Sequence, residues 1–454
     1  MENLLVNKVA AVKEVRQAAE YQKKKQACIL TGLAGSSKPV FFAAADKLLG
    51  GKGSMAFITA SREEIRTYRR ELNYLYPDLP MQELYPVSLP RVQADTQSLE
   101  LQAGRAAALR FLSGEERGIV FVTAEALQQK QLRPSGMSGK ALQLAVGEEH
   151  EQRNIAAALL DLGYERTEQV DALGQFCLRG DILDVYPINS SAAVRIEWFD
   201  NELDAMRSFD VDTQRSLQTL TSIKIAPLKV DESFSYDADI FEYCAADTMV
   251  VVDEPVHVFG MLEKLDKENK EHASELFGKQ ELIEQLAANG AVLVSALGHS
   301  YLQQLPSLNI PVRAVAPYNK NTNLLVEDLQ NWLAEGITPL IMLSGSIKAR
   351  GFADNLRNYG LKGHFAQKSF EPGVVNVTYG DLDHGFRFWD EEWLLLTEND
   401  IFGMQKRKRL HTKNQGQQLQ YFSDIKAGDY VVHKVHGIGR YIGVCSCRAG
   451  RYAA

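Results

Sequence analysis

A run of apolar residues that leads into a glycine- and serine-rich turn constrains the fold of this 454-residue chain more than any other feature. The apolar run covers residues 27–30, the turn covers 31–38, and a helical pattern starts at Pro39. A strand that passes through a short turn into a helix is the first part of a β-α-β unit, and such units build parallel sheets. Further apolar runs at 55–59 and 118–122 alternate with helical patterns. The start of the chain is therefore predicted to be an α/β domain with a mostly parallel sheet.

The turn has the layout of a phosphate-binding loop in which key residues are replaced. A working loop reads G-x-x-x-x-G-K-[S/T]: backbone amides hold phosphate, the lysine adds charge and the hydroxyl binds Mg²⁺. Aligning Gly32 and Lys38 with this pattern puts Ser37 at the second glycine and Pro39 at the hydroxyl position. Proline has neither the hydroxyl nor the N–H, although it suits the first turn of a helix. We therefore predict a degenerate loop that keeps its fold and has lost its chemistry.

A second stretch points to the same kind of fold. The apolar strand 249–252 ends in Asp253 and Glu254, as do strands whose carboxylates serve Mg²⁺ and catalysis in nucleotide hydrolases. A buried strand with solvated acids at its end is the simpler interpretation of these residues taken alone, and that alternative stays open. Under either interpretation of Asp253 and Glu254 we expect no ATP hydrolysis, because position 39 lacks the hydroxyl and no arginine finger is recognisable. We predict no catalytic residue, no bound cofactor and no enzymatic activity for this chain.

From about residue 139 the pattern changes to one helix followed by short strands and turns, which is typical of an α+β module with an antiparallel sheet. In the strand 194–199, Arg195, Glu197 and Phe199 alternate with apolar residues and share one face. Arginine and aromatic residues together are typical of protein-binding patches. A helix that covers this face is the alternative, and the pattern does not decide between the two. Arg179, predicted on a neighbouring strand, would extend the patch.

Composition excludes several other classes of protein. The net charge of −8 and the pI near 5.7 argue against a chain that coats nucleic acid, although a local basic patch could still contact phosphate. Five scattered cysteines suit a reducing cytosol, and no apolar run approaches the roughly 18 residues of a membrane span. We therefore predict a cytoplasmic protein without membrane contact.

No nucleophile set stands out among the nine histidines and five cysteines. The spacing of Cys445 and Cys447, near His433 and His436, is too short for common zinc sites, so no metal is predicted.

Three stretches of the α+β module carry a family resemblance. Residues 176–187, 195–200 and 209–216 resemble a module shared by the excision-repair subunit UvrB and the bacterial transcription-repair coupling factor. In both families this module docks onto the damage-recognition ATPase UvrA. The resemblance implies that Arg179, Arg195 and Phe199 contact UvrA, and these are the residues of the predicted patch.

Other stretches favour the coupling factor over UvrB. Residues 380–386 and 396–403 resemble its third domain, and 428–441 resemble the start of its CarD-like domain, which binds the RNA polymerase β subunit. UvrB keeps an intact phosphate loop and a DNA-gripping hairpin, and this sequence shows neither. The full-length family is an ATP- and Mg²⁺-dependent DNA translocase that holds DNA mainly through its motor lobes. We expect those lobes to be absent here, the last barrel to be incomplete, and polymerase binding to be weak or lost.

The predicted fold class is thus a multidomain α/β protein: a degenerate RecA/UvrB-like parallel-sheet domain with an inserted α+β antiparallel module, a further α/β domain and an incomplete β-barrel start. The predicted boundaries are 1–138 for UvrB-like domain 1a, 139–227 for the UvrA-interaction module, 228–318 for UvrB-like domain 1b, 319–405 for the third α/β domain, 406–427 for a linker, and 428–454 for a truncated CarD-like domain.

The predicted function is that of an adaptor, which recruits UvrA to stalled RNA polymerase in transcription-coupled nucleotide excision repair. A nucleotide-binding UvrB-like enzyme and a CarD-like transcription regulator are the alternatives.

Overall fold

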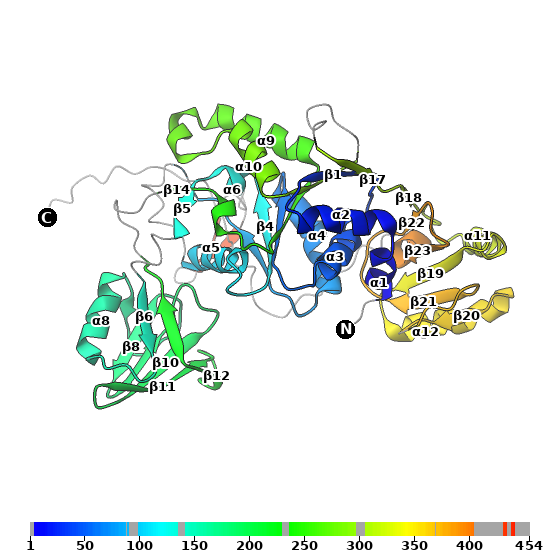
Figure 1. Cartoon of the computed structure of the whole chain (residues 1–454). Helices are drawn as coiled ribbons and strands as arrows, with labels where there is room; N and C mark the ends of the chain where they lie inside the picture. The colour runs from blue at the N-terminus through cyan, green and yellow to red at the C-terminus, as the bar shows by residue number, and fades with distance from the viewer. Residues whose placement is uncertain are drawn as a thin grey trace. The chain divides into compact units, whose positions relative to one another are not determined.

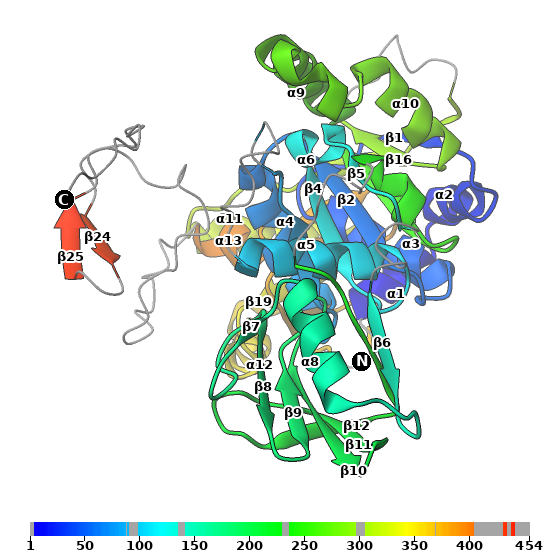
Figure 2. The ribbon, with the colours of Figure 1, turned by 90° about the vertical axis from the view of Figure 1, so that its left-hand side faces the viewer.

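The computed structural model describes residues 4–87, 89, 99–134, 141–228, 236–296, 305–367 and 369–403, and the strands Tyr430–His433 and Gly437–Arg440. The chain divides into one unit that ends at Met404 and a second that starts at Gln405. The first unit holds three main sheets with their helices (Figures 1 and 2). The predicted linker and most of the predicted CarD-like segment lie outside the described residues.

The largest sheet has seven strands in the order β17-β1-β16-β15-β2-β4-β3, and every pairing within it is parallel. Its strands come from both predicted UvrB-like domains, so 1a and 1b contribute to a single sheet. The strands are β1 (Cys28–Thr31), β2 (Met55–Thr59), β3 (Met81–Leu84), β4 (Ile119–Thr123), β15 (Met249–Asp253), β16 (Val292–Ser295) and β17 (Ser307–Asn309). The predicted parallel α/β sheet is confirmed.

Helices cover both faces of this sheet, which explains why its central strands are continuous apolar runs. In β4, for example, Ile119 and Phe121 enter one core while Val120 and Val122 enter the other. One face carries α1 (Leu4–Ala10), α2 (Lys13–Lys23), α3 (Ser37–Leu48) and α4 (Arg62–Leu75). The other carries α5 (Leu99–Leu112), α6 (Ala124–Gln128), α9 (Pro255–Glu268), α10 (Lys279–Ala288) and the 3₁₀ helix Ile240–Tyr243. The short strands β5 (Gln131–Leu132) and β14 (Tyr236–Ala238) pair separately, and a 3₁₀ helix spans Lys270–Glu275.

The second sheet is the predicted antiparallel module. Its order is β12-β11-β10-β9-β8-β7, and only the β7–β8 pair is parallel. The strands are β7 (Glu165–Arg166), β8 (Gln175–Arg179), β9 (Ile182–Val185), β10 (Ala193–Phe199), β11 (Glu202–Phe209) and β12 (Ser216–Leu220). Helix α8 (Gln152–Asp161) packs on one face through Ile155 and Leu159. The pair β6 (Leu142–Ala145) and β13 (Ser222–Ile225) contributes to the same core. The predicted α+β module is confirmed.

The third sheet has the order β18-β22-β23-β19-β21-β20. Strands β23, β19, β21 and β20 run parallel, whereas β22 is antiparallel to both of its neighbours. The strands are β18 (Val312–Ala314), β19 (Thr338–Leu343), β20 (Gly363–Phe365), β21 (Val375–Tyr379), β22 (Phe386–Phe388) and β23 (Trp393–Thr397). The helices are α11 (Thr322–Ala334), α12 (Ser346–Asn355), a 3₁₀ turn at Leu356–Tyr359 and α13 (Glu398–Phe402).

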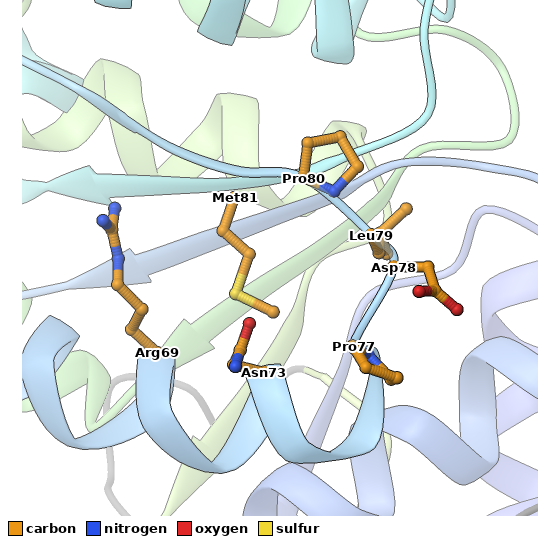
Figure 3. A pocket seen from close by; sticks show the side chains of 7 residues that line it. All are labelled: Arg69, Asn73, Pro77, Asp78, Leu79, Pro80 and Met81. Atoms are coloured by element: carbon orange, nitrogen blue, oxygen red, sulfur yellow. The ribbon is translucent and has the colours of Figure 1, made fainter.

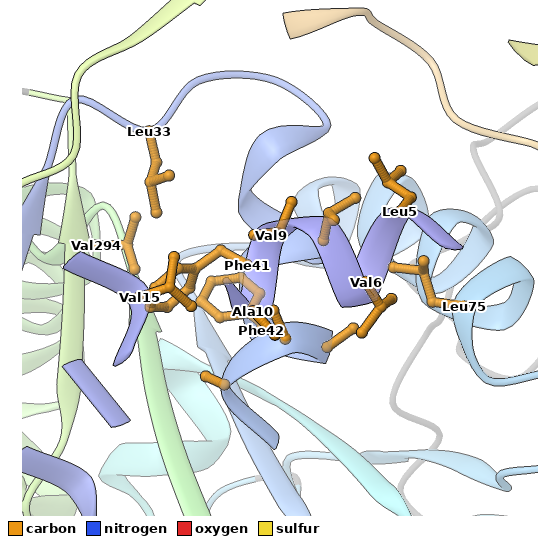
Figure 4. Close-up of a cluster of buried hydrophobic side chains, with 14 of the residues drawn as sticks. Leu5, Val6, Val9, Ala10, Val15, Leu33, Phe41, Phe42, Leu75 and Val294 are labelled. Atoms are coloured by element: carbon orange, nitrogen blue, oxygen red, sulfur yellow. The ribbon is translucent and has the colours of Figure 1, made fainter. Parts of the chain in front are cut away.

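One hydrophobic core joins the first and third sheets. Leu340 and Met342 of β19 belong to the same buried cluster as Val9 of α1 and Phe41 and Phe42 of α3. Figure 4 shows the α1 and α3 side chains of this cluster packed together. Burial of each large apolar side chain contributes roughly 1.5–3 kcal/mol. The third sheet is therefore packed against α1 and against α3, the helix that follows the degenerate phosphate loop.

The two described strands of the second unit form a hairpin. In β24 (Tyr430–His433) and β25 (Gly437–Arg440), Tyr430 pairs with Arg440 and His433 with Gly437. Among the described residues no barrel is closed. Within the same part of the chain, no helix combines the length and apolar character that a bilayer crossing requires.

Candidate functional site

The degenerate phosphate loop is closed on itself. The amides of Ser37 and Lys38 donate to the carbonyls of Ala34 and Gly35 at 3.2 Å each, and the Ala34 amide donates to Ser37 Oγ at 3.0 Å. These hydrogen bonds start α3 at Ser37. In a working loop such amides point at phosphate oxygens. Here they are occupied by the loop itself, and Pro39 has none to offer.

The glycine that suggested a phosphate loop has a packing role in this structure. Gly32 has φ +87°, and a Cβ placed on it would lie 2.5 Å from the carbonyl oxygen of Ile310. The Gly32 carbonyl also accepts a hydrogen bond from the Val312 amide at 3.3 Å. Glycine is therefore required at this position by the close approach of the segment after β17, whether or not phosphate binds.

Lys38 forms an internal ion cluster with the acids at the end of β15. Its Nζ lies 2.8 Å from Asp253 Oδ1 and 2.8 Å from Glu254 Oε1. Asp253 is 6% exposed, so it is buried and not solvated. Burial alone would lower the pKa of Lys38, but the two carboxylates reverse this and raise it. The positive charge that a phosphate or Mg²⁺ site would use is thus neutralised by carboxylates from the same chain.

A loop of the third sheet covers the other side of the degenerate loop. The buried Glu71 of α4 accepts hydrogen bonds from Ser36 Oγ and from the Asp383 amide, the latter at 2.9 Å. The His384 amide donates to Ser36 Oγ at 2.9 Å, and Arg70 forms an ion pair with Asp383. The stretch 380–386, which resembles the third domain of the family, therefore contacts both the degenerate loop and α4.

Replacing Glu71 with glutamine is expected to raise the melting temperature near neutral pH. Burial raises the pKa of Glu71, and the hydrogen bond from Ser36 offsets this only in part. A raised pKa means that the folded state binds the proton more tightly, so stability is lost as pH rises from the ordinary value of 4.5 through the folded-state pKa. Glu71→Gln keeps the acceptor oxygen without the charge.

Melting curves at several pH values test this expectation. The difference between Glu71→Gln and wild type should shrink as pH falls toward 4.5. Glu71→Ala is the matched control, since it leaves two donors without an acceptor and should destabilise at every pH. A wild-type protein more stable than Glu71→Gln near neutral pH would contradict the expectation.

The second candidate site is the solvent side of the antiparallel sheet, called here the outer face. Alternation along the strands and the pairing register place on it Cys177, Arg179, Ile182, Asp184, Arg195, Glu197 and Phe199. Helix α8 packs against the opposite face, which holds Val194, Ile196 and Trp198. The predicted alternation in β10 is confirmed, because these apolar residues are buried and Phe199 is 77% exposed. Among the described residues no helix covers Phe199, contrary to the alternative of a covered face.

Asp184 organises the two arginines of the outer face. Its Oδ1 lies 2.6 Å from Arg195 Nε and its Oδ2 lies 2.8 Å from Arg195 Nη2, a bidentate pair. Arg179 Nη2 reaches Oδ2 of the same carboxylate at 3.3 Å. Arg195 also contacts Gln214 Oε1 at 3.2 Å and lies over the Phe209 ring at 4.7 Å. The guanidinium of Arg195 is therefore held in one orientation, with its side chain 18% exposed.

The position of Arg179 corrects one prediction. Arg179 lies on β8, which is separated from β10 by β9, so it is one strand further from Arg195 than expected. Gly180, with φ +57°, forms a tight turn that returns the chain as β9 directly beside β8. The two arginines still meet, because both reach Asp184 on the intervening strand. Sequence reasoning missed Asp184, although an acid inside the apolar strand Ile182–Val185 was a visible signal.

A pocket of about 400 Å³ lies between the end of α4 and the start of β3 (Figure 3). It is lined by Arg69, Asn73, Pro77, Asp78, Leu79, Pro80 and Met81. In open α/β sheets ligands bind outside the carboxyl ends of the strands, whereas this pocket is at the amino end of β3. We assign it no function.

The metal candidates lie mostly beyond the described part of the chain. His433 is in β24, while His436, Cys445 and Cys447 are outside the described residues. Among the residues that are described, no group of His, Cys, Asp or Glu has the arrangement of a metal site.

Comparison with known proteins gives two family matches. The UvrB interaction domain matches residues 142–230, which include the whole outer face. The CarD-like/TRCF RID domain matches residues 425–451, which include β24 and β25. The transcription-repair-coupling factor of Bacillus subtilis (strain 168) is 25% identical over 497 residues, which cover 92% of this chain and 42% of that protein. The chain is a relative of the transcription-repair-coupling factors.

Other coupling factors agree with this assignment. Those of Staphylococcus epidermidis (strain ATCC 12228 / FDA PCI 1200) and Staphylococcus haemolyticus (strain JCSC1435) are each 24% identical, covering 93% and 94% of this chain respectively. The chain spans 42% of the length of each of these curated relatives. The coupling-factor family predicted from the sequence is thus confirmed, and the CarD-like match supports it over UvrB.

Proposed function

We propose that this chain is the part of a transcription-repair coupling factor that recruits UvrA, through the outer face of its UvrB interaction domain. The observation that carries the proposal is a largely exposed aromatic ring, Phe199, on the same face as two arginines that pair with one buried carboxylate. Aromatic and arginine anchors that are already held in place lose little conformational freedom on binding and are enriched at interface hot spots.

The two arginines have different roles in this proposal. Arg179 is the more exposed, with 56% of its side chain accessible, and it donates one contact to Asp184. Its remaining donors are free to take a carboxylate of UvrA. Arg195 is mostly enclosed, so it presents one edge of its guanidinium and supports the shape of the face.

Arg179→Ala is expected to weaken UvrA binding by about 2 kcal/mol, roughly 30-fold. The measurement is a titration of surface-immobilised chain with purified UvrA. Arg166→Ala is the matched control, because Arg166 is an exposed arginine of β7 in the same sheet but outside the outer face. No binding by the wild-type chain, or equal losses in both variants, would refute the proposed contact.

We further propose that the degenerate phosphate loop binds no nucleotide and that this chain does not hydrolyse ATP. The engaged amides of Ser37 and Lys38 and the ion cluster of Lys38 support this. The match to the CarD-like/TRCF RID domain supports a second proposed contact, between residues 425–451 and the RNA polymerase β subunit, which we expect to be weak. A chain with both contacts would act as an adaptor between stalled polymerase and UvrA in transcription-coupled nucleotide excision repair.

A further inference from the structure

Two arginines oppose each other at the edge of the third sheet. Strand β18 is the edge strand and lies beside β22 (Figure 1). Its antiparallel pairing with β22 puts Arg313 directly opposite Arg387. Directly opposed residues in such a pair have Cβ atoms about 4.5–5.5 Å apart and leave the sheet on the same face. Like charges in this arrangement destabilise the strand pair.

No group in the described part of the chain neutralises this arginine pair. Neither guanidinium forms an ion pair or a hydrogen bond there, and Arg387 Nε is buried without a partner. The acidic turn 390–392 follows β22 but does not supply the missing charge. Its Glu391 instead accepts a hydrogen bond from the Trp393 indole at 3.1 Å.

The antiparallel module shows how this chain neutralises the same arrangement elsewhere. Arg195 and Arg207 are directly opposed on β10 and β11. Each has a carboxylate of its own, Asp184 at 2.6 Å for Arg195 and Glu197 at 2.5 Å for Arg207. Arg313 and Arg387 therefore differ from Arg195 and Arg207, because they lack a counter-charge among the described residues.

An exposed aromatic ring, that of Trp389, lies beside the arginine pair. Trp389 is 57% exposed, and the guanidinium carbon of Arg313 lies 4.7 Å from the centre of its ring. The Trp389 amide donates to the Pro311 carbonyl at 2.9 Å, which fixes the residue beside β18. Proteins bind single-stranded nucleic acids with cationic side chains that contact the phosphates and aromatic rings that stack on the bases. A protein carboxylate would satisfy the guanidinium groups but would leave the indole without a matching partner.

We propose that Arg313, Arg387 and Trp389 form a binding site for one nucleotide unit of a single-stranded nucleic acid. The phosphate accepts hydrogen bonds from both guanidinium groups, and the base stacks on the exposed side of the indole. The negative charge of the whole chain does not prevent this, since charges beyond about 8 Å are screened at physiological salt. An occupied site relieves the repulsion between the two arginines.

Fluorescence anisotropy with a labelled oligothymidylate and the full chain tests the proposal at low salt. Arg313→Gln and Trp389→Ala are each expected to weaken binding about tenfold. Arg350→Gln is the matched control: Arg350 is exposed in the same domain and lies 4.9 Å over the Phe365 ring, but it has no arginine opposite. It should bind like wild type. Arg313→Gln should also melt no lower than wild type, because it removes a repulsion.

Competition experiments identify the source of the phosphate. Unlabelled oligothymidylate should displace the probe at concentrations where thymidine monophosphate and inorganic phosphate do not. Displacement by the monophosphate at equal concentration would overturn the strand assignment. Equal affinity of wild type, Arg313→Gln and Trp389→Ala for the probe would remove these residues from any nucleic-acid site. Binding of polyglutamate instead of the oligonucleotide would show a protein-binding patch and overturn the proposal.

Discussion

Phe199→Ala is expected to weaken UvrA binding by about 2 kcal/mol or more while leaving the stability of the chain unchanged. Phe199 is 77% exposed at the end of β10, so its ring contributes little to the fold of the free protein. A partner that covers the ring removes it from water and gains most of the burial energy of an aromatic side chain. Biolayer interferometry with purified UvrA and a thermal melt of each variant measure the two quantities separately.

Leu217→Ala is the matched control for this experiment. Leu217 is 62% exposed on β12, an edge strand of the same sheet that β11 separates from β10, so it offers a similar exposed apolar side chain. Its replacement should leave UvrA affinity unchanged. If Phe199→Ala and wild type bind UvrA equally, the exposed ring is not part of the interface and the outer face loses its central anchor.

Lys38→Met is expected to lower the free energy of unfolding by about 3 kcal/mol or more. The lysine bridges two carboxylates at 2.8 Å each, and 11% of its side chain is exposed. Removing it leaves the buried Asp253 without its counter-charge in a region of low dielectric constant. The midpoint of urea unfolding, followed by circular dichroism, reports the loss.

Lys23→Met serves as the control for the loss of a lysine. Lys23 pairs with Glu20 on the surface, with 49% of its side chain exposed, so its removal should cost no more than about 1 kcal/mol. A fluorescent ATP analogue separates the structural role of Lys38 from a catalytic one. Saturable micromolar binding that Lys38→Ala abolishes would show a working nucleotide site and refute the proposed closed loop. Unchanged stability of Lys38→Met would refute the ion cluster.

Together these experiments separate the two regions that the sequence singled out. The degenerate loop is expected to contribute stability and no ligand chemistry, because its amides and its lysine are bound by groups of the same chain. The outer face is expected to contribute binding and little stability, because its aromatic anchor is exposed.

The local elements of this protein follow from its sequence. Strand β2 has the predicted bounds of 55–59. Its four consecutive apolar residues, 55–58, are typical of a strand that is buried on both faces of a parallel sheet. The alternation in β10 was sufficient to place Phe199 on the face opposite Ile196 and Trp198, since side chains on a strand alternate with period two. That this face is open to solvent was decided by the structure. The loss of phosphate chemistry at Pro39 follows from its covalent structure alone.

Only the tertiary structure decided how distant residues meet. The contact of Lys38 with Asp253 joins the first turn of α3 to the end of β15, 215 positions away in the sequence, and it depends on the order of strands in the sheet. The strand order also put β9 between Arg179 and Arg195, so that one buried carboxylate holds both arginines. The opposition of Arg313 and Arg387 is a matter of register, and a shift of one residue would turn every side chain of β18 to the other face. Sequence patterns specify which face a residue occupies, whereas strand order and register are set by non-local packing.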